Sequence, residues 1–228
     1  MADDEPTPDH VGHRGRLRDR LLKDADGLLD HELIEYLLTT AMPRRDMKPL
    51  AYTLLREFRT LGGVLSADTA ALLRVKGMGE SAAAAIRIAQ AAGLRLVKEP
   101  VAAQPVLANW QALLDYLRAD MVHHAIERFR VLHLDTRNTL IRDEVMSVGT
   151  IDQAAVHVRE VIGAALRYGS AAIILVHNHP SGDPSPSRAD ITITRAIAGA
   201  GEPLGIVVHD HIIMGLNGHV SLKAQGLI

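Results

Sequence analysis

The sequence predicts an α+β domain, with a mixed sheet flanked by helices, preceded by a small all-α domain. Two patterns predict this fold class. Apolar residues recur at helical spacing through about the first hundred residues, and short continuous apolar runs typical of buried strands appear only beyond them, alternating with helical segments. The length of 228 residues also exceeds the usual size of one domain. We expect a flexible tail at residues 1–12, a helical domain at 13–97, a linker at 98–106 and the α+β domain at 107–228.

Composition excludes several classes of protein. The absence of cysteine excludes disulfides and thiolate zinc sites and is typical of a reducing compartment. No apolar segment is long enough to span a membrane, and the acidic start at 1–5 lacks the features of a signal peptide, so we expect a cytoplasmic protein without a membrane partner. The formal net charge of −2 argues against a strongly electrostatic nucleic-acid binder, although residues 13–23 form a basic stretch.

The first domain is expected to consist of helices. Apolar residues recur at helical spacing from Leu21 to Leu38, Pro43 interrupts the pattern, and the pattern resumes from Leu50 to Phe58. The segment that follows, at 72–88, has the sequence LLRVKGMGES and then an alanine-rich run, and it resembles a helix-hairpin-helix element.

This element offers a candidate contact with DNA. Its two glycines permit a tight turn whose exposed N–H groups, at the start of a helix, can hold a phosphate. A G-x-G between two helices is also common as a simple turn, so both interpretations stay open. The candidate DNA-binding residues are Lys76, Gly77, Gly79 and Ser81.

The second domain is expected to follow the linker, which has two prolines and small residues at 98–105. Its strands are marked by apolar runs, and the turn of a hairpin by Asp135-Thr136-Arg137-Asn138. The expected elements are a helix from Trp110, strands at 129–134 and 139–148, a helix at 152–166 ending near Gly169, a strand at 171–176, a helix to Gly201 and a strand at 205–214.

The segment from His177 to Asp190, HNHPSGDPSPSRAD, is the most informative part of the chain. The buried strand before it delivers His177 and His179, and side chains two residues apart on a strand point to the same side. Prolines and a glycine then turn the chain back over the strand end. A helix is expected next, with Ser185 as its N-cap and Pro186 as its first residue.

Ser187 and Asp190 are three residues apart and therefore share one face of that helix. Two neutral imidazole nitrogens and one carboxylate oxygen are a normal ligand set for a catalytic Zn²⁺, which leaves a fourth position for water. Taken singly, an H-x-H pair is usually structural, and Ser187 and Asp190 are ordinary at a helix start. Taken together, these residues predict one zinc ion per chain, held by His177, His179 and Asp190.

The pattern His177-x-His179-Pro180, followed by Ser187-x-x-Asp190, resembles the JAMM motif of the JAB/MPN metalloprotease superfamily. The flanking sequences are similar to its RadC-like branch over nearly the whole chain, from about Gly12 to Ile228. The flanks that carry this similarity are HNHPSGDPSPS, Arg159-Glu160, Asp210-His211-Ile212-Ile213 and Ser221-Leu222; Val158 departs from it, because that branch usually has a proline there.

The resemblance implies a JAB fold and a role for each motif residue. Two histidines and the aspartate would bind zinc, Ser187 would help to stabilise the oxyanion, and an upstream glutamate would hold and deprotonate the water. Family order sets that glutamate at the entry to the first strand of the domain, which selects Glu127 as the catalytic base. Glu144 is the main competitor and Glu160 a weaker one, and each is otherwise a surface carboxylate.

A second H-x-H, His209-Asp210-His211, also lies on an expected strand. No Ser-x-x-Asp helix follows it, so we expect these residues to be structural or to orient a metal-bound histidine. His123, His124 and His133 have no partners at ligand spacing and are expected to be surface or packing residues.

The resemblance implies a JAMM-type zinc metalloprotease that cleaves a peptide or isopeptide bond in a peptide or protein substrate through a metal-activated water. The ligand set by itself supports only metal-assisted hydrolysis. The alternative is a DNA-associated protein, related to repair or recombination, whose metal domain is structural or mediates protein contacts. A metal-dependent nuclease ranks last because the motif has too few carboxylates for a Mg²⁺ or paired-metal site.

Overall fold

The computed structural model describes residues 9–149 and 156–228. The chain divides into two compact units, Met1–Ala92 and Gly93–Ile228, and the described residues of each form a hydrophobic core of their own. No helix among the described residues is both long enough and apolar enough to cross a membrane.

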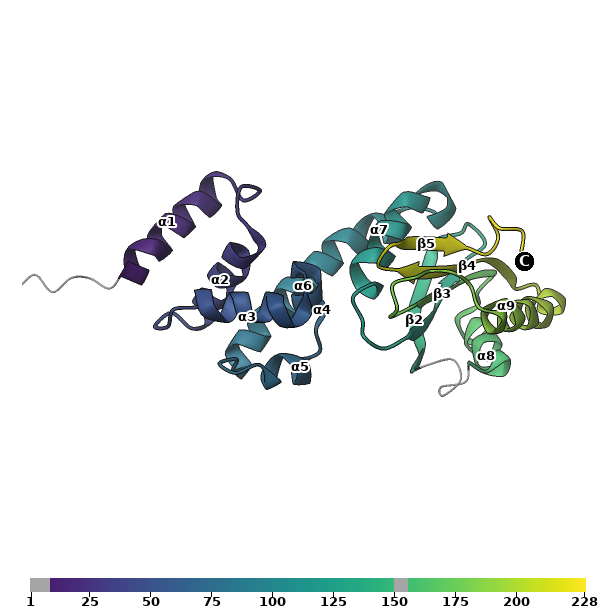
Figure 1. The fold of residues 1–228 in the computed structure, drawn as a ribbon. Helices are drawn as coiled ribbons and strands as arrows, with labels where there is room; N and C mark the ends of the chain where they lie inside the picture. Colours follow the sequence, from purple (N-terminus) through teal and green to yellow (C-terminus); the bar gives the residue numbers. More distant parts are fainter. Residues whose placement is uncertain (1–8, 150–155) are drawn as a thin grey trace, which may run out of the picture. The chain divides into compact units, whose positions relative to one another are not determined.

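The first unit is entirely helical in its described residues, as the leucine spacing predicts (Figure 1). Two of its short helices begin at side-chain caps, because Thr60 Oγ1 accepts a hydrogen bond from Gly63 N and Asp68 Oδ1 accepts one from Ala71 N. Its helices are α1 (Asp9–Lys23), α2 (Asp30–Ala41), α3 (Lys48–Phe58), α4 (Leu61–Ser66), α5 (Thr69–Arg74) and the first half of α6 (Glu80–Ala103).

Helix α6 continues through the segment for which the sequence predicts a linker. Pro100 lies inside this helix, although a proline there removes one backbone hydrogen bond. Tertiary contacts offset that cost, because Val101 is buried in the core of the second unit and Lys98 Nζ lies 3.1 Å from Asp143 Oδ2. The structure also differs from the expected tail at 1–12, since α1 begins at Asp9; residues 1–8 lie outside the described part.

The second unit is an α+β fold built on a mixed five-stranded sheet, which confirms the predicted fold class. The strand order is β2-β1-β3-β4-β5; β3 and β4 are parallel and the other neighbours are antiparallel. The strands are β1 (Arg128–Leu134), β2 (Leu140–Val148), β3 (Ala172–Asn178), β4 (Val207–Gly215) and β5 (Gly218–Ser221), and the helices are η1 (Val106–Ala108), α7 (Trp110–Met121), α8 (Val158–Tyr168), α9 (Arg188–Gly201) and η2 (Glu202–Leu204).

Helices cover both faces of the sheet (Figure 1). Helix α7 packs on the face that carries Leu132 and Ile174, and α8 and α9 pack on the face that carries Val131 and Ile173. The central strand β3 is therefore buried along its whole length, as its unbroken apolar run predicts. Side chains alternate between the two faces along β3, so His177 lies on the same face as Ile173, toward α9.

The β1–β2 turn lies where the sequence predicts it, whereas helix α8 agrees with the prediction at its end. In the β1–β2 turn Asn138 N donates to Asp135 O, and Asn138 adopts a φ of 61°, which confirms the expected hairpin. Helix α8 ends at the left-handed Gly169, as expected, but begins only at Val158. The expected helix start at 152–155 lies outside the described residues.

The predicted start of α9 is wrong by two residues. Ser187, not Ser185, is the N-cap, because Ser187 and Asp190 form a reciprocal capping box. Ser187 N donates to Asp190 Oδ2 at 2.7 Å, and Asp190 N donates to Ser187 Oγ at 3.2 Å. The backbone N and the hydroxyl of Ser185 instead both donate to Asp183 Oδ1, so Ser185 shapes the loop before the helix.

Candidate metal centre

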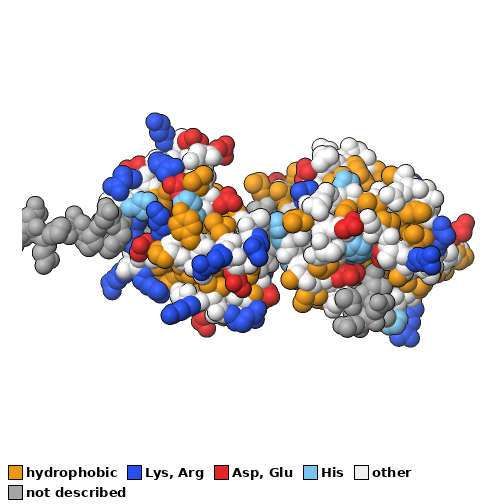
Figure 2. All heavy atoms as spheres, viewed as in Figure 1, with side chains coloured by type: hydrophobic (Ala, Val, Ile, Leu, Met, Phe, Trp, Pro, Cys, Tyr) orange, Lys and Arg blue, Asp and Glu red, His pale blue; other side chains and the backbone are white. Residues whose placement is uncertain are grey.

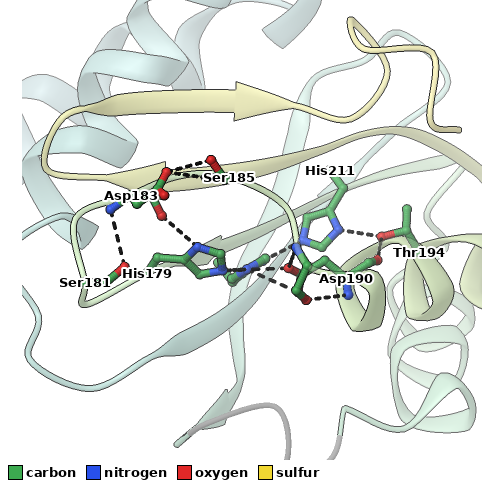
Figure 3. A network of polar contacts seen from close by, with 9 residues as sticks. His179, Ser181, Asp183, Ser185, Asp190, Thr194 and His211 are labelled. Atoms are coloured by element: carbon green, nitrogen blue, oxygen red, sulfur yellow. Dashed lines mark hydrogen bonds and ion pairs between the residues drawn. The ribbon is translucent and has the colours of Figure 1, made fainter.

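Three side chains with metal-binding atoms meet at the C-terminal end of β3. His177 lies on β3, His179 directly follows it, and Asp190 lies in the first turn of α9 (Figure 3). Each offers one ligand atom, and these atoms all lie within 4.8 Å of one another. His177 and Asp190 are fully buried, while 19% of the His179 side chain is exposed. The group is thus closed on the protein side and open where His179 meets solvent.

The distances within the group show that the ligand atoms of the three side chains lie close to one another. His177 Nε2 lies 2.8 Å from His179 Nε2 and 3.4 Å from Asp190 Oδ1, and His179 Nε2 lies 3.7 Å from Asp190 Oδ2. Asp190 Oδ2 is used by the helix cap, but Oδ1 is buried and has no hydrogen-bond partner among the described residues. An unsatisfied buried carboxylate oxygen facing two imidazoles fits a bound cation.

The loop after β3 sets the orientation of His179. His179 Nδ1 lies 2.9 Å from the carbonyl oxygen of Asp183, which can only accept a hydrogen bond. Nδ1 therefore carries the hydrogen, and in the neutral ring Nε2 presents a lone pair toward His177 and Asp190. The strand end is held by His179 N, which donates to Met214 O at 2.8 Å.

The ionisation states of the two buried residues suit metal ligands. Burial lowers the pKa of His177 to about 4, so its ring is neutral at neutral pH. Burial would raise the pKa of Asp190, but its contacts with His179, His177 and Ser187 outweigh burial and hold that pKa well below the ordinary value. The hydrogen bond with Asp190 is the main cause that raises the pKa of His179. The group could therefore hold a metal ion, which would displace at most the proton on His179.

The three candidate glutamates lie in different surroundings. The antiparallel register pairs Phe129 with His177, and Glu127 lies two residues before Phe129, directly before the start of β1. The charge of Glu127 also contributes to the raised pKa of His179. Glu144 instead accepts a hydrogen bond from Tyr168 Oη at 3.2 Å, and Glu160 is exposed in the first turn of α8.

Ser187 stands at the rim of the group. It is exposed, and its Oγ accepts the hydrogen bond of the helix cap, which leaves its own hydroxyl hydrogen available to donate. The spacing of three residues between Ser187 and Asp190 therefore caps the helix, and the same capping box fixes the orientation of the Asp190 carboxylate.

Asn178 is a site residue that the sequence analysis missed. It lies between the two histidines and points to the opposite side of β3, where it is fully buried. Its Oδ1 accepts from Arg128 N at 2.8 Å, and its Nδ2 donates to the carbonyl oxygens of His124 and Ile126, each at 3.4 Å. Asn178 thus holds the backbone on both sides of the candidate base. An asparagine inside a buried apolar strand was the available signal.

Two buried residues stand behind His177. His211 Nε2 lies 2.8 Å from His177 Nδ1, and Thr194 Oγ1 lies 2.5 Å from His211 Nδ1 (Figure 3). His211 thus has the contact expected of a residue that orients a metal-bound histidine, whereas nothing in the sequence pattern marks Thr194. His133 is instead buried against Tyr168 of α8, with Nδ1 3.0 Å from Ser170 Oγ.

The candidate DNA-binding residues lie in and just after the turn between α5 and α6. Gly77 adopts a φ of 99°, and Met78 N donates to Val75 O at 3.0 Å, so the tight turn is formed as expected. Lys76 and Gly79 belong to this turn, and Ser81 lies in the first turn of α6 beside the acidic Glu80. Figure 2 shows basic side chains spread over the visible face of this unit among acidic and apolar ones. DNA binding stays a prediction.

Comparison with known proteins agrees with this geometry. Residues 107–227 match the family model described as RadC-like JAB domain. The chain is also 48% identical over 213 residues to a UPF0758 protein of Rhodobacter capsulatus, an alignment that covers 93% of this chain and 100% of that protein. A sheet with a His-His-Asp group at the end of its central strand, together with these two matches, leads to one conclusion: the chain belongs to the family of RadC-like JAB-domain proteins.

Proposed function

We propose that the second unit is a zinc-dependent hydrolase that cleaves a peptide or isopeptide bond. The observation that carries this proposal is the convergence of two imidazole nitrogens on a buried carboxylate oxygen that lacks a partner among the described residues. A tetrahedral zinc ion with bonds of about 2.1 Å holds its ligand atoms about 3.4 Å apart. His177 Nε2 lies 3.4 Å from Asp190 Oδ1, which equals that value, and 2.8 Å from His179 Nε2, which is somewhat shorter.

The donor set also suits zinc chemically. Imidazole and carboxylate are common zinc ligands, and three protein ligands leave one position open, as in catalytic rather than structural zinc sites. When bound, zinc would supply Lewis acidity, which lowers the pKa of a coordinated water to about 7 and polarises a carbonyl.

The residues of the chain supply the remaining steps. Glu127, whose charge contributes to the raised pKa of His179, accepts a proton from the attacking water and returns it to the leaving nitrogen. Ser187 donates its free hydroxyl hydrogen to the carbonyl oxygen as that oxygen gains negative charge. Buried Asn178 keeps the segment of Glu127 in place through its three backbone contacts.

Elemental analysis of untagged protein tests the metal site. About one zinc per chain is expected in the wild type and none in the His177→Ala/His179→Ala variant. A matched control is His209→Ala/His219→Ala, which also removes two histidines but leaves the His-His-Asp group intact. Equal zinc in all three proteins, or none in the wild type, would contradict the proposal.

Activity is tested separately with a panel of peptide and isopeptide substrates. Glu127→Gln is expected to bind zinc normally and to lose turnover. Turnover that persists in this variant, or that survives complete removal of zinc, would contradict the assigned chemistry.

DNA binding by the first unit is the second candidate function. The observation that favours it is the tight turn at Gly77, directly before the start of α6. Fluorescence anisotropy with duplex and single-stranded DNA, compared between wild type and Lys76→Ala, tests it. Binding that is equal in both proteins, or absent, would argue against this surface.

A further inference from the structure

We propose that Thr194 and His211 are positioning residues that fix the tautomer of His177, so that its Nε2 lone pair is directed at the metal position. This inference rests on the proposed metal site. It concerns a line of buried polar groups that runs from the backbone of α9 through β4 to β3 (Figure 3).

The line consists of three contacts. Thr194 Oγ1 donates to the carbonyl oxygen of Asp190 at 2.5 Å, His211 Nδ1 lies 2.5 Å from Thr194 Oγ1, and His211 Nε2 lies 2.8 Å from His177 Nδ1. Thr194, His211 and His177 are all fully buried. Water is therefore not an alternative partner for these groups, and each contact needs one hydrogen between its two atoms.

The carbonyl end gives the line its direction. The oxygen of Asp190 can only accept, so the single hydroxyl hydrogen of Thr194 is used there. Thr194 Oγ1 must then accept its second hydrogen bond, and His211 Nδ1 must carry the hydrogen that it donates. The direction of both hydrogen bonds of Thr194 is thus determined, because its hydroxyl has only one hydrogen.

The next step depends on His211 being neutral. Its two hydrogen-bond partners are a hydroxyl and an imidazole, neither of which carries negative charge, and complete burial disfavours an imidazolium between them. Phe129 packs against the ring edge-to-face with centroids 5.7 Å apart, which adds an apolar wall.

A neutral His211 with hydrogen on Nδ1 has a lone pair on Nε2. That lone pair accepts from His177 Nδ1, which must carry the hydrogen of the 2.8 Å contact. Nε2 of His177 is then free of hydrogen and faces His179 Nε2 and Asp190 Oδ1. Neutral histidine in water prefers its hydrogen on Nε2, so this line imposes the less favoured tautomer, which is the one that a metal requires at Nε2.

One turn of α9 therefore serves the site twice. The Asp190 side chain is a ligand, and the Asp190 carbonyl, four residues before Thr194, is the acceptor that orients a second ligand. His179 receives its own orientation from the carbonyl of Asp183, independently of this line.

A pair of Thr194 variants tests the inference. Thr194→Val removes the hydroxyl and keeps the branched shape, whereas Thr194→Ser keeps the hydroxyl. In metal-free protein labelled with ¹⁵N-histidine, ¹H–¹⁵N correlation spectra report which ring nitrogen of His177 carries hydrogen. We expect Nδ1–H in the wild type and in Thr194→Ser, and a shift toward Nε2–H in Thr194→Val.

Zinc affinity, measured by competition with a chromophoric chelator at one pH, gives the second readout. We expect Thr194→Val to bind zinc about 10–100-fold more weakly than the wild type, and Thr194→Ser to restore the wild-type affinity. His211→Phe provides a second way to remove the acceptor if Thr194→Val does not fold.

The outcomes separate the two proposals. Nε2–H on His177 in the wild type would overturn the inference whether or not zinc binds. Tight zinc binding that is equal in the wild type and in Thr194→Val would overturn it and leave the metal site intact. A wild type without zinc affinity but with Nδ1–H on His177 would contradict the proposed function alone.

Discussion

Replacing Asp190 by asparagine should remove the metal site without removing the helix cap. In the structure the two carboxylate oxygens have separate tasks, since Oδ2 accepts from Ser187 N and Oδ1 faces His177 Nε2 at 3.4 Å. An amide oxygen can still accept from Ser187 N. The amide NH₂ group would then point at the imidazole nitrogens and occupy the metal position with a hydrogen-bond donor.

The magnitude of each effect follows from these contacts. Loss of one hydrogen bond costs about 1 kcal/mol, so Asp190→Ala, which removes the acceptor of Ser187 N, should be less stable than Asp190→Asn by that amount in chelator. Zinc at about a thousand times its dissociation constant should stabilise the wild type by about 4 kcal/mol, because it binds only the folded state. Zinc should stabilise neither variant.

The assay is urea denaturation followed by tryptophan fluorescence at pH 8. Trp110 is the single tryptophan of the chain and lies in α7, so its signal reports unfolding of the second unit. Zinc-dependent stabilisation of Asp190→Asn, or equal stability of the two variants in chelator, would refute this assignment of the two oxygens.

Three further predictions concern the surroundings of the site. Glu127→Gln should keep zinc and lower turnover at least about a hundredfold, while Glu144→Gln should stay active. Steady-state kinetics and elemental analysis of both variants check this. The reverse pattern would identify Glu144 as the base. Asn178→Ala should destabilise the protein by about 2 kcal/mol in urea denaturation, because it leaves Arg128 N without this partner, and should lower turnover with zinc retained; loss of zinc with full stability would contradict this role. In metal-free protein the pKa of His177 is about 4 when folded and about 6.5 when unfolded, so stability should be complete above pH 6.5 and fall by about 3 kcal/mol toward pH 4. His177→Gln should lose this part of the pH dependence, and an unchanged profile would exclude His177 as its source.

The sequence predicted the elements that depend on local pattern. The apolar run before His177 identified β3, the residues at Asp135–Asn138 identified the hairpin, and Gly169 marked the end of α8. These features are local because strand burial, turn geometry and left-handed backbone each depend on a few neighbouring residues.

Local pattern failed where contacts distant in sequence prevail. Prolines predicted a linker, yet α6 continues through Pro100 because Val101 and Lys98 find partners in the second unit. At α9, Ser185 matched the cap preference as well as Ser187, and the reciprocal bonds with Asp190 selected Ser187.

By itself the sequence determined that His177, His179 and Asp190 form one candidate ligand set, because strand alternation and helical spacing bring them to one strand end. Only the tertiary structure decided what surrounds that set. Asn178 holds the backbone at Ile126 and Arg128, on either side of Glu127, and Thr194 reaches His177 through His211. Strand pairing and hydrogen bonds between separate elements are set by the packing of the whole domain, and a periodic pattern along the chain carries no record of them.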